Sequence, residues 1–256
     1  MFGLQLDLPL WQLLPAITII LGAAVLRGYS GFGFSSLTVT SLALFMPPKM
    51  VVPTIFMLEI AASIHLLPGI FRQVDRKLLG QLLVGTLICT PIGVWLLTHL
   101  PEAHTRLMIC LMVLACAILL LLGFEQKNAN PRLPMATGFV SGLANGAAAI
   151  GGLPVVLMML YTQMSPIATR ATLVAFFAFT DIYALIWTGH QDLLTDDVIS
   201  LGIIFLVPMI IGLSVGRFLF KRSGQKSFRN LALVLLISVS VIGLARSGYQ
   251  MLLGGA

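Results

Sequence analysis

Arg27-Gly28-Tyr29-Ser30-Gly31-Phe32-Gly33-Phe34 interrupts one long apolar run of the sequence, and Asn145-Gly146-Ala147-Ala148-Ala149-Ile150-Gly151-Gly152-Leu153-Pro154 interrupts another at the matching place in the second half. Glycine residues at these positions favour a break in a helix. A break inside a bilayer frees backbone groups that hydrocarbon cannot satisfy, so it persists only where it is buried in protein or lines a cavity. Paired breaks in two halves of a chain are typical of the binding site of a secondary transporter.

The composition indicates a membrane protein. Hydrophobic residues make up 58% of the 256 residues, only 9% are charged, and the mean hydropathy is +1.02, whereas soluble domains carry roughly 25% charged residues. Residues 1–10 include Asp7 and lead straight into a long apolar stretch, without the pattern of a cleavable signal peptide. We therefore expect a multi-pass protein whose first hydrophobic segment is retained.

Apolar runs between polar residues predict full membrane spans, each long enough to cross a core of ~30 Å. The predicted spans are about 50–70, 79–98, 106–123, 167–188, 197–217 and 229–248. Two further regions, about 10–46 and 133–164, are each split by a glycine-rich break into arms of roughly 12–18 residues. Arms this short favour half-helices or a re-entrant pair over two full crossings.

The two halves of the chain are related by a step of 118 residues, which carries Gly28 to Gly146 and Pro48 to Pro166. Glycine and proline matches carry most weight because each constrains backbone geometry. The sequence therefore predicts an all-α polytopic membrane protein with two repeats, each with a broken helical pair and three spanning helices. A single transmembrane domain, 1–256, contains repeat 1 at about 10–123 and repeat 2 at about 133–250.

Loop charges predict that the repeats are inverted relative to each other. The loop at 72–77 is basic, whereas its repeat partner at 190–197 contains three aspartates and no lysine or arginine. The loop at 221–229 is also basic, and basic loops face the cytoplasm. This assignment places both basic loops and Lys127 with Arg132 inside, and both termini outside.

Ionisable residues within spans are functional candidates, because burying one costs about 2.5–3.5 kcal/mol at mid-span. The candidates are Arg27, Glu59, His65, Arg170 and Asp181. Glu59 and Asp181, with His65, are proton-coupling candidates, and Glu59 is favoured because it lies nearer mid-span and follows the broken arm. Structural alternatives remain: Arg27 capping a helix, Arg170 anchoring at the interface, His65 as a plain interfacial histidine, and both carboxylates as polar contacts between helices.

The breaks predict a site for a small anion. Half-helices that begin around residues 34–36 and 153–155 would present unpaired N–H groups and a positive dipole end. The alternative is that the glycines serve close helix packing. The predicted substrate-binding residues are Arg27, Gly28, Ser30, Gly31, Gly33, Ser35, Asn145, Gly146, Gly151, Gly152 and Arg170.

The sequence contains no zinc motif, no phosphate-binding loop and no Ser/His/Asp arrangement. Cys89, Cys110 and Cys116 lie in apolar stretches without the spacing of metal ligands. We therefore expect no enzymatic activity, no cofactor and no nucleic-acid partner. The lipid bilayer and a small anion are the expected partners, and the oligomeric state is left open.

The chain resembles the sulfite exporter TauE/SafE family, also called the TSUP permeases. The resemblance is carried by the stretch from Gly28 to Phe34 with Pro47-Pro48, by Gly146 to Pro154, and by Ser165-Pro166 with Ala168-Thr169-Arg170-Ala171-Thr172. It implies a bacterial inner-membrane transporter of small sulfur-containing anions such as sulfite, sulfonates or sulfoacetate. An exporter of amino acids or other small anions, and an anion channel, are the alternatives.

Overall fold

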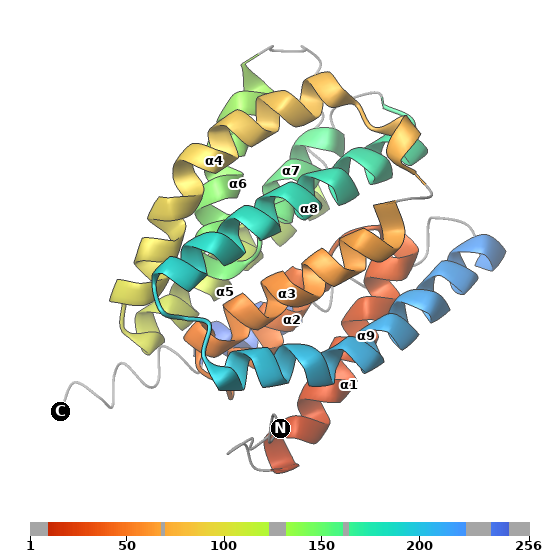
Figure 1. Cartoon of the computed structure of the whole chain (residues 1–256). Helices are drawn as coiled ribbons and strands as arrows, with labels where there is room; N and C mark the ends of the chain where they lie inside the picture. The colour runs from red at the N-terminus through yellow and green to blue at the C-terminus, as the bar shows by residue number, and fades with distance from the viewer. Residues whose placement is uncertain (1–9, 68–69, 123–131, 161–163, 224–236, 246–256) are drawn as a thin grey trace.

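The computed structural model describes residues 10–67, 70–122, 132–160, 164–223 and 237–245, and the regular structure in these ranges is entirely helical (Figure 1). A 3-10 turn, η2, covers Phe71–Gln73, and residues 237–245 are helical. The α-helices are α1 Leu10–Ser30, α2 Phe34–Leu42, α3 Pro48–Leu66, α4 Arg76–His99, α5 Glu102–Leu122, α6 Leu133–Ala148, α7 Gly152–Leu160, α8 Pro166–His190 and α9 Asp196–Ser223.

Six helices in the described residues are long and apolar enough to cross a membrane. Five of them, α3, α4, α5, α8 and α9, confirm predicted spans. The sixth is α1, whose 21 residues exceed the 12–18 expected for an arm of a broken region. Its partner α2 has only 9 residues, so each break joins a longer helix to a short one. Of the predicted span 229–248, only residues 237–245 lie within the described ranges.

The two long helices that follow the broken regions both begin with a proline. Pro48 and Pro166 occupy the first positions of α3 and α8, where proline costs no hydrogen bond. The Ser165 side chain caps α8 by accepting a hydrogen bond from the Ala168 N–H at 3.3 Å. The Asp75 carboxylate caps α4 by accepting from the N–H groups of Lys77 and Leu78, each at 3.0 Å.

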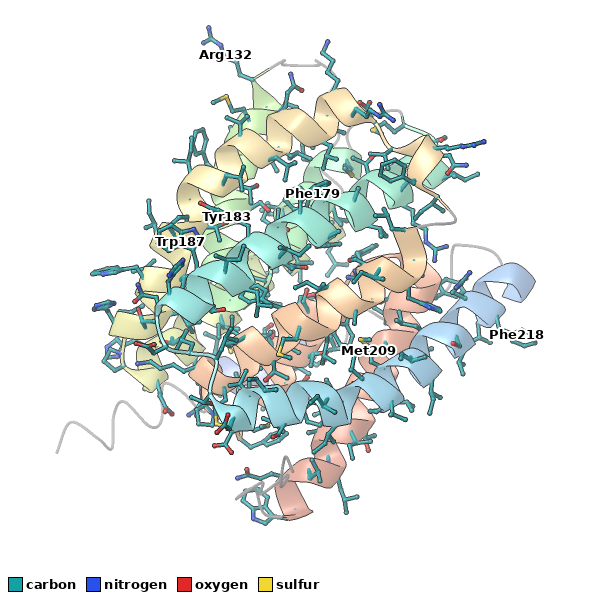
Figure 2. The ribbon with its side chains drawn as sticks, in the orientation of Figure 1. Arg132, Phe179, Tyr183, Trp187, Met209 and Phe218 are labelled. Carbon is teal, nitrogen blue, oxygen red and sulfur yellow. The ribbon has the colours of Figure 1, made fainter. Side chains whose placement is uncertain are left out.

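The central layer of the bundle consists of α3 and α8, which lie side by side (Figure 1). On one flank, α9 packs against α3 and α1 packs against α9; on the other, α4 packs against α8 and α6 packs against α4. Large apolar side chains cover the outside; Phe179 on α8 is 53% exposed, as is Phe218 on α9 (Figure 2). An apolar exterior of this extent is stable only in contact with lipid or another apolar surface.

Two helix pairs approach along glycines, and in both the helices run parallel. A Cβ placed on Gly146 of α6 would lie 2.8 Å from the Val94 nitrogen of α4. A Cβ on Gly28 of α1 would lie 3.1 Å from the Arg217 nitrogen of α9. Small residues let membrane helices pack backbone to backbone, where dispersion and polar contacts replace the hydrophobic effect. These two glycine seams, α4 with α6 and α1 with α9, fix the flanks of the bundle.

Two glycines of α4 provide a direct test of the seam. A Cβ on Gly93 would lie 2.7 Å from the Ala147 nitrogen, whereas a Cβ on Gly80 would meet nothing within 4 Å. We expect Gly93→Ala to destabilise the protein by about 1–3 kcal/mol, because the helices must separate. Gly80→Ala should be neutral or stabilising by up to about 1 kcal/mol, since alanine favours a helix. Thermal unfolding in detergent measures both, and equal effects would contradict the packing described.

Candidate functional site

The first break lies between α1 and α2. Gly31 and Gly33 have φ angles of 85° and 93°, in the left-handed region that glycine adopts without strain. The Gly31 N–H donates to the Arg27 carbonyl oxygen at 2.7 Å. The Arg170 side chain of α8 donates from Nη2 to the carbonyl oxygen of Gly28 at 3.2 Å. The prediction of a break at this glycine stretch is confirmed, and α2 begins at Phe34 as expected.

The second break lies between α6 and α7. Here the left-handed residue is Ala149, with a φ of 54°, and its N–H donates to the Asn145 carbonyl oxygen at 2.7 Å. A residue with a Cβ pays roughly 1–2 kcal/mol for this conformation. The Ser141 hydroxyl of α6 donates to the Gly151 carbonyl oxygen at 2.5 Å, so a freed backbone group is paired. The helix α7 begins at Gly152, close to the predicted start.

A buried ion pair joins the first broken helix to the central layer. The Arg27 guanidinium of α1 pairs with the Glu59 carboxylate of α3, and the two side chains are 0% and 1% exposed. Arg27 Nη2 also donates to the Ser63 hydroxyl at 3.3 Å. Ser35, near the start of α2, lies close to the Glu59 carboxylate. The pair therefore ties together both sides of the first break.

A second polar contact joins the second broken helix to the central layer. Asn145 Nδ2 of α6 donates to Asp181 Oδ1 of α8 at 3.1 Å. Asp181 is 1% exposed, and its Oδ2 has no hydrogen-bond partner among the described residues. Its carboxylate interacts electrostatically with both Glu59 and Arg27. The two breaks thus converge on one buried polar centre, which consists of Arg27, Glu59, Ser63, Asn145 and Asp181.

Phe177 of α8 lies between the two breaks. Its ring centroid is 4.8 Å from the Arg27 guanidinium carbon, a cation–π contact. The same ring lies against the Cα of Gly152, where any side chain would overlap it. A glycine at the start of α7 is therefore required for the close approach of the second break to the aromatic ring.

The polar centre contains one guanidinium group and two carboxylates. Arg27 forms an ion pair with Glu59, while among the described residues Asp181 accepts a hydrogen bond only from the neutral amide of Asn145. Two ionised carboxylates would leave a net negative charge in a fully buried site, which costs several kcal/mol. The site therefore has more carboxylates than guanidinium groups, and Asp181 is the carboxylate without an ion-pair partner among the described residues.

Several other predicted site residues lie elsewhere. Gly28 and Gly146 lie in the glycine seams, so these two glycines serve close helix packing, the alternative to a role in anion binding. Gly33 caps α2, and a Cβ on it would lie 3.0 Å from a Leu26 side-chain carbon. A Cβ on Gly151 would lie 2.7 Å from the Asn145 Cβ. Ser30 ends α1, and its side chain lies outside what the structure describes.

Arg170 and His65 occupy the end of the bundle where α3 and α9 finish. Arg170 is half-buried, and a Cβ on Gly31 would lie 3.0 Å from its Cγ, so its side chain passes along the first break. His65 is exposed and contacts Arg217 of α9, with 3.2 Å between Nε2 and Nη1. It makes no contact with Glu59 in the described structure, so the three predicted proton-coupling residues do not form one cluster.

Sequence reasoning missed Ser63, Ser141, Phe177 and Arg217. The two serines resemble the many small polar residues of these helices, and Phe177 is one of 15 phenylalanines. Arg217 lies at the end of a predicted span, where a basic residue is an ordinary topology signal. Among the described residues, no group of three or more His, Cys, Asp or Glu side chains could hold a metal ion.

The fold and the site define the class: a multi-pass helical membrane transporter with paired broken helices around a buried polar centre. Residues 16–242 match the profile of the family described as Sulfite exporter TauE/SafE, which covers most of the chain. The chain belongs to this transporter family. Searches of curated proteins and of solved structures gave no significant match.

The buried ion pair can be tested by a double-mutant cycle. We expect Glu59→Gln or Arg27→Gln alone to destabilise the protein by about 3–5 kcal/mol, because each leaves an uncompensated buried charge. The double variant should lose much less than the sum. Glu102→Gln is the matched control: Glu102 is partly exposed and pairs with Arg106 at 3.5 Å, so its loss should cost about 0–1 kcal/mol. Additive single effects in thermal unfolding would contradict the pairing.

Proposed function

We propose that the protein is a secondary transporter of a small sulfur-containing anion, such as sulfite, a sulfonate or sulfoacetate, in a bacterial inner membrane. The observation that carries this proposal is the convergence of both broken helices on the buried polar centre. The start of α2 meets Glu59 through Ser35, and the start of α7 meets the Phe177 ring through Gly152. Backbone N–H groups at two helix starts can bind the oxygens of one anion from opposite sides. The family match supports the sulfur-containing class of substrate.

The proposed mechanism is alternating access between two inverted repeats, about 10–123 and 133–250. The step of 118 residues pairs α1 with α6, and a step of 117 residues, from Gly85 to Gly202 and from Pro91 to Pro208, pairs α4 with α9. The α1–α9 seam is then the counterpart of the α6–α4 seam, and each seam joins a helix of one repeat to a helix of the other. The two parallel pairs also point in opposite directions (Figure 1). The pairing of each repeat's helices with helices of the other repeat supports a two-fold axis in the membrane plane, with the substrate held between the repeats.

The direction of transport follows from electrostatics. The exit of an anion from a cell with a negative interior is favoured by about 2.3 kcal/mol per charge per 100 mV of membrane potential. Export of a dianion such as sulfite together with one proton still carries one negative charge outward, so export needs no other driving ion, whereas import does. We propose export, with Asp181 rather than Glu59 as the group that exchanges a proton. Glu59 is held by Arg27, but one oxygen of Asp181 has no hydrogen-bond partner among the described residues. An anion binds more tightly beside a neutral carboxyl group, so anion and proton binding are linked.

An exporter of zwitterions is the second candidate, because a specific residue favours it. A zwitterion such as an amino acid or an amino sulfonate requires a carboxylate near the anion site to bind its ammonium group. Asp181 can supply that carboxylate from α8. Both candidates use the same buried polar centre and differ in the charge of the ligand.

Efflux from proteoliposomes tests the proposed function. We expect saturable efflux of sulfite, with competition from thiosulfate and sulfoacetate, and little competition from alanine. Competition by taurine and alanine, but not by sulfite, would replace the proposal with the zwitterion exporter. Flux that rises without saturation would indicate a channel. Binding should also raise the thermal stability of the purified protein, by about 2.7 kcal/mol at a hundredfold excess over Kd.

Asp181→Asn tests the proton-coupling role. The amide imitates the protonated carboxyl, so we expect sulfite efflux to continue while proton movement with it disappears. A pH-sensitive dye inside the liposomes measures that movement. Asp192→Asn is the matched control, since Asp192 is exposed and outside the polar centre. Unchanged proton movement in Asp181→Asn would refute this role, and a folded variant without any sulfite binding would assign Asp181 to the substrate.

A further inference from the structure

The buried polar centre has no solvent-exposed member, since each of its five residues is 2% exposed or less. A ligand therefore reaches the centre only after a neighbouring group has moved. The glycine seams hold the flanking helices backbone to backbone, and the ion pair holds Arg27 to Glu59. A side chain held only by ring contacts moves more readily than either, because rotation about χ1 leaves the backbone in place.

Phe177 of α8 is such a side chain. It is 3% exposed, and its ring lies between the Arg27 guanidinium and the first residue of α7. The ring centroid is 4.8 Å from the guanidinium carbon, while Cζ and Cε1, at the far edge of the ring, lie against Gly152. Positions four apart share one face of an α-helix, so Phe177 and Asp181 are neighbours on the same face of α8.

Arg27 retains hydrogen-bonding capacity beside this ring. Its Nη1 pairs with Glu59 and its Nη2 donates to Ser63, whereas Nε has no hydrogen-bond partner among the described residues. The negative face of the ring attracts the cation, but a charge-assisted hydrogen bond to an oxyanion is stronger. An oxyanion that contacted both this guanidinium and the start of α7 would need the space that the ring fills.

We propose that Phe177 is the gating residue of the anion site. Its ring fills the position between Arg27 and the start of α7 when the site is empty, and it rotates away when an oxyanion binds there. The guanidinium then exchanges a weak contact with the ring for a stronger one with the ligand, so it has a neighbour in both states. This inference rests on the proposed anion transport, for which it names the side chain that controls occupancy.

Competition between the ring and the anion determines the sign of the expected effects. If only the state with the ring rotated away binds the anion, the apparent Kd is the intrinsic Kd divided by the fraction of protein in that state. A weaker contact between the ring and Arg27 raises this fraction and tightens binding. A ring that served packing alone would have the opposite effect, because its loss would loosen the site and raise the Kd.

Two changes at Phe177 test the gate by calorimetric titration of the purified protein with sulfite. Phe177→Leu removes the aromatic face and should lower the Kd about three- to tenfold. A difluorophenylalanine with both fluorines on the ortho carbons keeps the ring edge at Gly152 but weakens the cation–π contact, and should lower the Kd about two- to fivefold. Phe176→Leu is the matched control, since Phe176 is 0% exposed and makes no cation–π contact in the described structure. Its Kd should equal that of the wild type.

Outcomes separate this inference from the proposed function. A Kd for sulfite that rises or stays the same in both Phe177 variants, or that falls equally in Phe176→Leu, overturns the gate while sulfite transport stands. If Phe177→Leu does not fold, the fluorinated ring alone decides. If the wild type binds another member of a panel with sulfate, phosphate and thiosulfate in place of sulfite, the choice of sulfite fails, and the same Kd comparison with that anion still tests the gate.

Discussion

The rest of this structure depends on one constraint: a helix that breaks inside hydrocarbon must find partners within the protein for the backbone groups it frees. At the first break, Arg170 of α8 binds the carbonyl of Gly28, so a residue from the second half of the chain completes a turn in the first. At the second break, Ser141 of α6 binds the carbonyl of Gly151. The first break is therefore stable only after both halves have packed together, and the fold and the site share the same contacts.

The charges of the polar centre follow from that packing. The pair of Arg27 and Glu59 is buried next to the first break, and the contact of Asn145 with Asp181 is buried next to the second. A buried ion pair contributes little net stability, but the removal of one partner is costly, so such a pair specifies one arrangement over others. The two carboxylates therefore have different partners. One carboxylate, that of Glu59, forms an ion pair with Arg27, whereas that of Asp181 accepts a hydrogen bond from the neutral amide of Asn145.

The sequence predicted the broken helices, five spans and every residue of the polar centre except Ser63, because glycine clusters and buried charges are rare in an apolar chain. It could not tell which glycine breaks a helix and which packs it: Gly31 breaks, whereas Gly28 lies in the α1–α9 seam. The left-handed residue of the second break is Ala149, which carries no glycine signal. Phe177 and Arg217 were missed since their roles depend on neighbours that are distant in the chain.

The seams also restrict how the polar centre could open. The backbones of Gly93 and Gly146 are nearly in contact, as are those of Gly28 and Gly216, so neither pair can slide without losing close contacts along its length. In the proposed alternating-access movement, each seam would therefore move as one body and carry a break with it: α1 would carry the first and α6 the second. The interface between these bodies is the central layer of α3 and α8, which holds Glu59 and Asp181. Any movement that exposes the centre has to change the contacts of those two carboxylates, so the pairing of Glu59 with Arg27 and of Asp181 with Asn145 depends on the conformation of the protein.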